Sequence, residues 1–195
     1  MDAQLSALAA VASEQLQVMA PMVATAEEAE WFARTCRDKG LPSVGVMIEI
    51  PSAALRAAEL LASVDFVSVG TNDLAQYAFA ADRELGAVSA LHDPWQPALL
   101  DLIAMTASAA AAAGKPCGIC GESAAGPALA CVLVGLGAST LSMGASALPA
   151  VRTALAAHTL EQCRLAAEAA RAQVTAAQAR AVAHEYLPGL GRLGL

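Results

Sequence analysis

Short apolar runs alternate with segments of helical composition along this chain, and this alternation is what most limits the possible fold. We expect strands at residues 16–20, 44–48, 65–69, 116–120 and 140–143. Helices are expected before and between them, at residues 3–12, 25–39, 54–61, 74–81, 93–113 and 124–136. Because parallel strands need long connections that are usually helical, the pattern predicts a parallel sheet covered by helices.

The number of strand–helix units leaves two architectures open. Five units do not close an eight-stranded barrel. The residues alone therefore allow an open doubly wound sheet, or part of a barrel whose first strands are absent. Further helices are expected at residues 149–158, 160–173 and 176–186, and the tail 187–195 is expected to be frayed. No linker interrupts the chain, so we expect residues 1–195 to form one α/β domain.

Carboxylates follow two neighbouring strands of this predicted sheet. Glu49 comes directly after the second predicted strand, and Asp73 follows the third within the run GTND. In parallel α/β folds, functional side chains gather at the C-terminal ends of the strands. Two carboxylates with the amide of Asn72 beside them suit Mg²⁺, which leaves its other positions to water and substrate oxygens. Arg83 is a candidate partner for the phosphate or carboxylate of a substrate held there.

Composition and charge narrow the classes of partner. Aromatic residues make up only 4% of the chain, the net charge is −7 and the pI is about 4.8. A general binder of nucleic acid or of anionic membranes needs stacking surfaces or positive charge, so neither class is expected. The mean hydropathy is +0.52, but no uncharged apolar stretch is long enough to span a bilayer.

The start of the chain and its cysteines indicate a compartment. Residues 1–17 lack the basic start and leucine-rich middle of a signal peptide, so we expect a cytoplasmic protein. Five scattered cysteines, an odd number, are then expected to be free thiols.

Three segments resemble one known family. GVMIEIPSAAL (45–55), DFVSVGTNDLAQYAFAADR (65–83) and KPCGICGE (115–122) resemble the phosphoenolpyruvate (PEP)-binding domain of PEP-utilising enzymes. The likeness is greatest to enzyme I of the bacterial sugar phosphotransferase system and covers about residues 16–187. It implies a (β/α)₈ TIM-barrel type of fold, of which the present strands would be the last five, followed by C-terminal helices.

The same resemblance implies roles for individual residues. Glu49 and Asp73 match the Mg²⁺ ligands of the family. Asn72 matches a residue that contacts the phosphoryl group, and Arg83 matches a phosphate-binding arginine. Cys120 matches the cysteine that protonates the enolate carbon.

The activity implied by the resemblance is transfer of the phosphoryl group from PEP to a protein histidine, with release of pyruvate. Mg²⁺ would neutralise charge on the substrate, since phosphoryl transfer depends on positioning and electrostatics. In the family the histidine lies on a separate domain and passes the group to the small carrier protein HPr for sugar uptake. Family members dimerise through the barrel, so a homodimer is expected.

Several departures from the family pattern predict that this chain is catalytically incomplete by itself. Family barrels carry two further phosphate-clamping arginines on earlier segments. One lies on a strand that is missing here, and the other lies in a helix whose counterpart here, LSALAAVAS, has no arginine. None of His92, His158 and His184 lies in the phosphohistidine motif. After CGE the family has a glycine–aspartate pair, whereas this chain has SAAG.

Two alternative functions remain open on the sequence. One is a truncated barrel that acts as a dimerisation or regulatory module and binds PEP weakly or not at all. The other is a different metal-dependent pyruvate-enolate barrel, such as an aldolase or lyase, although those lack the combination of GTNDL–ADR and CGICGE.

Each candidate residue also has an ordinary structural interpretation. Glu49 and Asp73 would cap the following helices, and Asn72 would be a turn residue. Arg83 would pair with its neighbouring acids, and Cys120 would be an inert buried thiol. Packing roles are expected for Trp31, Trp95, Cys36, Cys131 and Cys163, and a loop position for His92.

Overall fold

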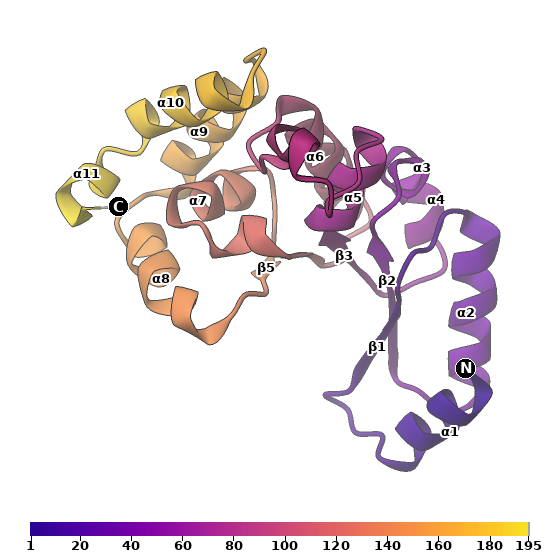
Figure 1. Cartoon of the computed structure of the whole chain (residues 1–195). Coiled ribbons are helices and arrows are strands. Elements are labelled where there is room, and N and C mark those ends of the chain that lie inside the picture. Colours follow the sequence, from indigo (N-terminus) through magenta and orange to yellow (C-terminus); the bar gives the residue numbers. More distant parts are fainter. Residues whose placement is uncertain (195) are drawn as a thin grey trace.

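The predicted alternation of strands and helices is present in the computed structural model, which describes residues 1–194. The strands form one parallel sheet in the order β1-β2-β3-β4-β5 (Figure 1). Their bounds are Gln17–Ala20 (β1), Ser43–Ile48 (β2), Phe66–Gly70 (β3), Cys117–Cys120 (β4) and Thr140–Leu141 (β5). The strands follow one another in the sheet in the same order as in the sequence. Successive right-handed strand–helix–strand units give this arrangement.

Helices connect the strands and extend beyond the last one. Their bounds are α1 Asp2–Ala10, α2 Ala26–Asp38, α3 Pro51–Leu55, α4 Ala57–Leu61, α5 Thr71–Ala78, α6 Pro97–Ala112, α7 Pro127–Gly135, α8 Leu148–Ala156, α9 Leu160–Arg171, α10 Ala176–Tyr186 and α11 Gly189–Leu193. Shorter 3₁₀ segments are η1 (Gly86–His92), η2 (Glu122–Ala125) and η3 (Ala145–Ala147). The N-terminal helices α1 and α2 lie at one end of the molecule and α9 to α11 at the other (Figure 1).

Prolines set the start of several helices, and this shifts the predicted boundaries. Pro51, Pro97 and Pro127 each lie in the first turn of their helix, where the missing N–H costs nothing. The helix predicted at 93–113 therefore begins at Pro97, and the one predicted at 124–136 is divided into η2 and α7. The helix predicted at 54–61 begins earlier and breaks at Arg56, which has φ −116° and ψ 27°.

A capping box begins α2, as the predicted N-cap at Thr25 requires. The Thr25 hydroxyl accepts the backbone N–H of Glu28, and the Glu28 carboxylate accepts the backbone N–H of Thr25. Two of the free donors at the helix start are thereby satisfied.

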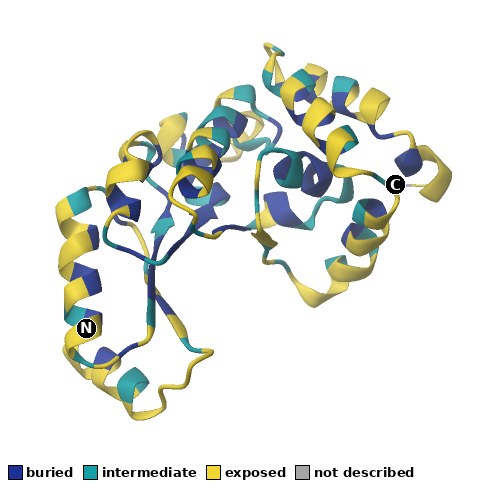
Figure 2. Cartoon of the chain, turned by 180° about the vertical axis from the view of Figure 1, so that it is seen from behind, coloured by how far each residue is buried: buried dark blue, intermediate teal, exposed yellow. Residues whose placement is uncertain are grey.

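The core lies along the sheet, between the strands and the faces of the helices turned toward them (Figure 2). Val44, Val46 and Ile48 of β2 are fully buried, and every residue of β3 is buried. Such continuous burial is usual for the central strands of a parallel sheet that helices cover.

The C-terminal tail corrects one prediction, because residues 187–190 are packed rather than frayed, whereas residues 191–194 are helical or turn residues that are exposed. Leu187 and Leu190 are buried, and the backbone N–H of Gly189 donates to Nε2 of His158 at 3.0 Å. A Cβ at Gly189 would come within 2.7 Å of the same nitrogen, so the tail fits closely here. Leu195, the last residue of that predicted tail, lies outside the described residues.

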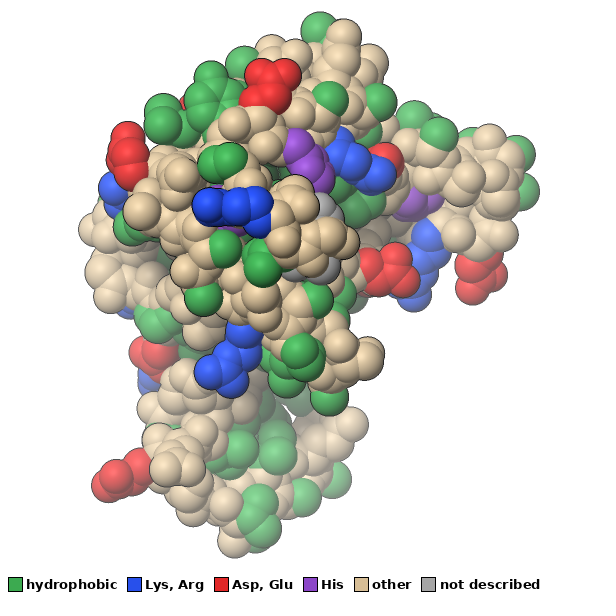
Figure 3. All heavy atoms as spheres, turned by 90° about the vertical axis from the view of Figure 1, so that its left-hand side faces the viewer, with side chains coloured by type: hydrophobic (Ala, Val, Ile, Leu, Met, Phe, Trp, Pro, Cys, Tyr) green, Lys and Arg blue, Asp and Glu red, His purple; other side chains and the backbone are tan. Residues whose placement is uncertain are grey.

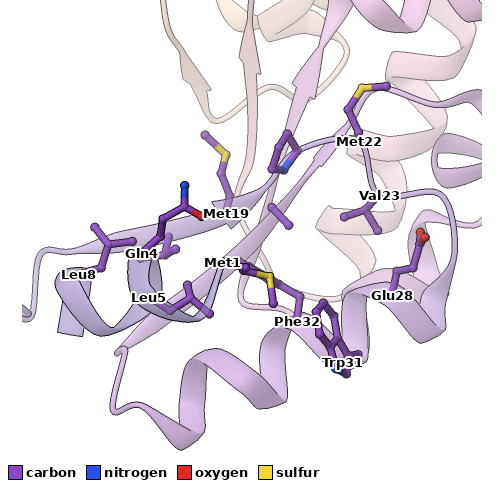
Figure 4. Close-up of a pocket in the computed structure, with 13 residues that line it drawn as sticks. Met1, Gln4, Leu5, Leu8, Met19, Met22, Val23, Glu28, Trp31 and Phe32 are labelled. Atoms are coloured by element: carbon purple, nitrogen blue, oxygen red, sulfur yellow. The ribbon is translucent and has the colours of Figure 1, made fainter.

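A groove of about 460 Å³ runs beside the first strand, between α1, β1 and α2 (Figure 4). Met19, Met22 and Trp31 line it and are each more than 40% exposed. Trp31 is 49% exposed, so the prediction that it is a packing residue is wrong for the exposed half of its side chain. Trp95 is buried, as predicted. β1 has β2 as its only strand neighbour among residues 1–194, so this groove lies at an open edge of the sheet.

The outer surface has a mixed charge. On the face turned to the viewer in Figure 3, Lys and Arg side chains are interspersed with Asp and Glu and form no single basic patch. Among residues 1–194, every helix is too short or too polar to cross a lipid bilayer.

Candidate functional site

The candidate residues come from the ends of three adjacent strands. In the parallel register, Ile48 of β2 lies beside Val69 of β3, and Gly70 of β3 lies beside Cys120 of β4. Glu49, the GTND run and Cys120 are therefore at the same edge of the sheet. This is the edge where parallel α/β proteins place their chemistry.

Glu49 is held in a defined position by its surroundings. Its side chain is buried, and its Oε2 accepts the backbone N–H of Met22 at 2.9 Å. Met22 adopts a φ of +57°, which is uncommon for a residue with a side chain. The carboxylate also lies against Gly70, where an added Cβ would fall 2.6 Å from Oε1. Residue 70 must therefore be glycine for Glu49 to keep this place.

The first turn of α5 carries Asn72 and Asp73. The Asp73 carboxylate lies in the first helical turn, where the helix dipole favours an acid, so its ordinary structural role is also met. Nη1 of Arg83 lies 3.8 Å from Oδ2 of Asp73, and the backbone N–H of Arg83 donates to Gln76. The ion pair of Arg83 is thus with Asp73 and not with its sequence neighbours Asp82 and Glu84.

Hydrogen bonds join the loop after β3 to the loop after β4. Thr71 donates its hydroxyl to the carbonyl of Cys120 at 3.1 Å, and Ser123 donates to the Thr71 hydroxyl at 2.9 Å. The backbone N–H of Glu122 donates to Oδ1 of Asn72 at 3.4 Å. Asn72 is therefore more than a turn residue, since this bond fixes the direction of its two amide N–H donors.

A glycine makes the junction of these two loops possible. Gly121 has a φ of +96°, and a Cβ there would meet Oγ1 of Thr71 at 2.7 Å. The sequence reasoning missed Thr71 and Ser123 as supporting residues. Their only signal was their position beside the GTND and CGE motifs.

Cys120 is the last residue of β4 and is half-buried. Its Sγ donates to the carbonyl oxygen of Val69, at 3.5 Å. Cys117, one residue after the expected start of the strand, is instead buried in the core, and burial raises the pKa of its thiol to about 11. All five cysteines are free, so the CxxC spacing forms no disulfide.

A cavity of about 440 Å³ opens beside this junction. It contains Asn72 and Arg83 in its wall, but neither Glu49, Asp73 nor Cys120. Its other lining residues are Thr71, Ala75, Glu84, Ser89, His92, Pro94, Leu99, Glu122 and Ser123. The five predicted residues are thus brought to one edge of the sheet, two of them in the cavity and three beside it.

The donor set at this edge fits Mg²⁺ as a partly protein-bound ion. Within residues 1–194, no cluster of three or more His, Cys, Asp or Glu side chains could enclose a metal. Two carboxylates from neighbouring strand ends, Glu49 and Asp73, are nevertheless the usual protein share for Mg²⁺, which keeps water and substrate oxygens as its other ligands.

Comparison with known proteins assigns the chain to a family. The model of the PEP-binding domain of PEP-utilising enzymes matches residues 1–160. A phosphoenolpyruvate-protein phosphotransferase from Streptomyces coelicolor is 60% identical over 190 residues, covering 95% of this chain and 34% of the relative. The enzyme of the same name from Haemophilus influenzae is 36% identical over 200 residues, covering 96% of this chain and 35% of the relative. The chain thus spans about a third of these relatives.

Solved structures are also similar in fold, and one of them is an aldolase. An HpcH/HpaI aldolase from Desulfitobacterium hafniense superposes with a TM-score of 0.55 and 18% identity, covering 76% of this chain and 64% of that chain. At this identity the likeness shows the fold alone. It confirms the prediction of a TIM-barrel type of α/β fold, present here as a part of the barrel.

Proposed function

Because the chain belongs to the PEP-utilising enzymes through their PEP-binding domain, we propose that it is the PEP-binding part of a phosphoenolpyruvate-protein phosphotransferase. The reaction would transfer the phosphoryl group of PEP to a protein histidine and release pyruvate. One observation carries the proposal: Asn72 and Arg83 share a cavity beside the strand ends that hold Glu49, Asp73 and Cys120.

Asn72 and Arg83 would bind the phosphoryl group. Arg83 is half exposed and reaches into the cavity from the loop that follows α5. Its guanidinium offers several N–H donors in a planar fork that suits phosphate. The Asn72 amide adds N–H donors, since its oxygen is already used by Glu122. Such fixed donors lower the cost of charge in phosphoryl transfer.

Glu49 and Asp73 would hold Mg²⁺, which supplies neutralisation of charge on the substrate oxygens when bound. The Met22 N–H and the glycine at position 70 keep Glu49 in one orientation before any ligand arrives. Asp73 is near Arg83, so the same carboxylate orients the guanidinium while the cavity is free of substrate.

Cys120 would deliver the proton that converts the enolate to pyruvate. Its thiol lies at the strand end and is only half-buried. In the structure the S–H group donates to a backbone carbonyl, and this hydrogen bond is weak enough to be broken when the proton is transferred to a substrate carbon. The four buried cysteines have no such access.

The complete reaction would need parts beyond this sequence. The histidine acceptor, HPr as the next carrier, a homodimer and a cytoplasmic location are included in the proposal by analogy with the family. One of the two absent phosphate-clamping arginines would come from the first part of the barrel, whereas the position of the other lies in the segment LSALAAVAS of this chain, which has no arginine. The first part of the barrel would pair with the open edge at β1, where the groove of Figure 4 exposes apolar side chains.

Calorimetric titration of PEP into the chain, with and without Mg²⁺, tests this proposal. We expect binding that depends on Mg²⁺ and weakens at least tenfold in Asp73→Ala, because a metal ligand and the orienting partner of Arg83 are both lost, on the order of 1.4 kcal/mol or more. Asp38→Ala is the matched control, since it removes one exposed carboxylate at the far end of α2.

The outcome also separates the two functional candidates. Equal binding by Asp73→Ala and by the wild type would contradict the metal assignment. Absence of binding in a sample that is folded by circular dichroism would instead favour a module for dimerisation or regulation, for which the exposed groove beside β1 is the supporting observation.

A further inference from the structure

One buried nitrogen in the candidate cavity has no hydrogen-bond partner. Among the side chains of residues 1–194, Nε2 of His92 is shielded from solvent and has no hydrogen-bond partner. Buried polar atoms are almost always paired, because burial without a partner costs the hydrogen bonds formerly made to water. This exception therefore needs a physical explanation.

The position of His92 suggests that a ligand supplies the missing partner. His92 lines the same cavity as Asn72 and Arg83. The wall also includes Ser89, Glu84 and Glu122. A ring nitrogen that carries a proton is a donor, as are the guanidinium and the amide, so the three groups suit the same anionic oxygens.

The segment that carries His92 allows the ring to turn toward such a ligand. η1 has no buried residue, so a small movement of this segment displaces no buried side chain of its own. The chain becomes anchored directly afterwards: Asp93 accepts the backbone N–H of Trp95 at 3.0 Å and pairs with Arg180, and Trp95 is buried. His92 is therefore at the boundary between an exposed segment and a fixed turn.

We propose that His92 is a further substrate-binding residue, whose imidazole N–H donates to an anionic oxygen of PEP in the cavity that Arg83 and Asn72 line. This rests on the proposed function, and it adds a residue that lies outside the quoted motifs. The imidazole turns about its side-chain bonds from its shielded position when the ligand enters, which exchanges an unpaired nitrogen for a charge-assisted hydrogen bond.

The substitution His92→Phe separates a binding role from a packing role. Phenylalanine keeps a planar ring of similar size but has no polar atom to bury. If His92 only packs, this variant is at least as stable as the wild type and binds PEP equally well. If His92 binds substrate, the variant has an unchanged or raised Tm and a PEP affinity that is lower by roughly tenfold. His92→Gln, which keeps an N–H donor, is expected to recover part of the affinity.

Imidazole NMR signals of the wild-type chain provide a direct readout. The chain has three histidines. His158 is an internal control, because its Nδ1 lies 2.7 Å from the carbonyl of Ala154 and its Nε2 accepts the N–H of Gly189. Titration with PEP and Mg²⁺ is expected to shift the ring nitrogen signals of His92, assigned by their loss in His92→Gln, and to leave those of His158 in place.

The possible results distinguish this inference from the function on which it rests. Binding of PEP that Arg83→Ala abolishes, but that neither shifts His92 nor weakens in His92→Phe, overturns the role of His92 and leaves the proposed function standing. Absence of PEP binding to the folded wild type overturns both. Shifts at His92 together with weaker binding by His92→Phe and recovery by His92→Gln support both.

Discussion

Exposure differs sharply among the five thiols, and at the scale of single residues this makes Cys120 chemically distinct. Cys36, Cys117, Cys131 and Cys163 are all at most 2% exposed, whereas Cys120 is half-buried at the end of β4. Burial raises the pKa of Cys36 and Cys117, while the hydrogen bond with Cys163, together with burial, raises the pKa of Cys131. Since the thiolate is the reactive form, Cys36, Cys117 and Cys131 are protected both by burial and by a raised pKa. The hydrogen bond with Cys131 lowers the pKa of Cys163, so burial alone protects that thiol.

We therefore predict that iodoacetamide modifies Cys120 first in the native chain. Peptide mass spectrometry at short reaction times should place most of the label on Cys120, and Cys120→Ser should remove it. PEP with Mg²⁺ should slow the modification. First labelling of Cys131 or Cys163 would contradict this ordering of the thiols.

Single residues also show what the sequence could and could not predict about the site. Motif spacing predicted that Asn72 and Asp73 follow a strand end beside Cys120, because parallel strands bring their ends together. The helix predicted at 74–81 begins earlier, at Thr71, so both residues lie in its first turn. It could not predict that Thr71 and Ser123 connect the loops, since this contact depends on the conformation of Gly121. The unpaired nitrogen of His92 has no signal in the sequence at all, because burial of one atom depends on the packing of distant segments.

At the scale of secondary-structure elements, the most tightly constrained contact is the packing of α7 on α9. A Cβ at Gly135 would lie 2.1 Å from the carbonyl oxygen of Cys163, a backbone atom that cannot move alone. Glycine at this position therefore sets how near the two helices approach.

Gly135→Ala should destabilise the chain by about 1–3 kcal/mol, because the helices must separate to admit the methyl group. For a chain of this size, Tm falls by about 2–4 °C for each kcal/mol. Thermal unfolding monitored by circular dichroism measures this change. Gly86→Ala is the control, since a Cβ there has no atom within 4 Å, and its Tm should not fall. An equal Tm for both variants would mean that α7 and α9 can separate without cost.

Helices and strands were predicted well where the pattern of apolar residues was regular. They were predicted less well at the chain terminus and where a helix is interrupted. The five strands and the capped start of α2 are as expected. The helix at 54–61 was not expected to break at Arg56, since its composition is helical throughout. The packed C-terminal tail was also missed, because a glycine-rich sequence conveys no local preference, and the fold of α11 depends on long-range contacts of Leu187 and Leu190.

An open sheet edge with an apolar groove is the dominant feature at the scale of the whole molecule. β1 exposes its outer side, and Met19 on it is 42% exposed. A strand edge of this kind can pair with a strand of another chain. Natural sheets often prevent such pairing with a charged residue, especially lysine, on the edge strand.

We predict that the chain self-associates at micromolar concentration through this edge and that Met19→Lys reduces the association. Light scattering coupled to size-exclusion chromatography measures the mass, and Val174→Lys, at a position 87% exposed between α9 and α10, is the control. A monodisperse wild-type monomer would contradict the prediction. An equal reduction of the association by both lysine variants would also contradict the prediction, because the change in net charge would then explain it.

The hydrogen bonds around the strand ends determine which segment of the chain can be transferred to another protein with the site intact. Met22 holds Glu49 from the loop after β1, and Ser123 holds Thr71 from the loop after β4. The site consequently belongs to no single strand–helix unit. For an engineer who grafts barrel fragments, or for a gene that exchanges them by recombination, the smallest transferable segment that keeps this geometry runs from Met22 to Ser123. A crossover inside that interval would separate one half of the site from the groups that orient the other.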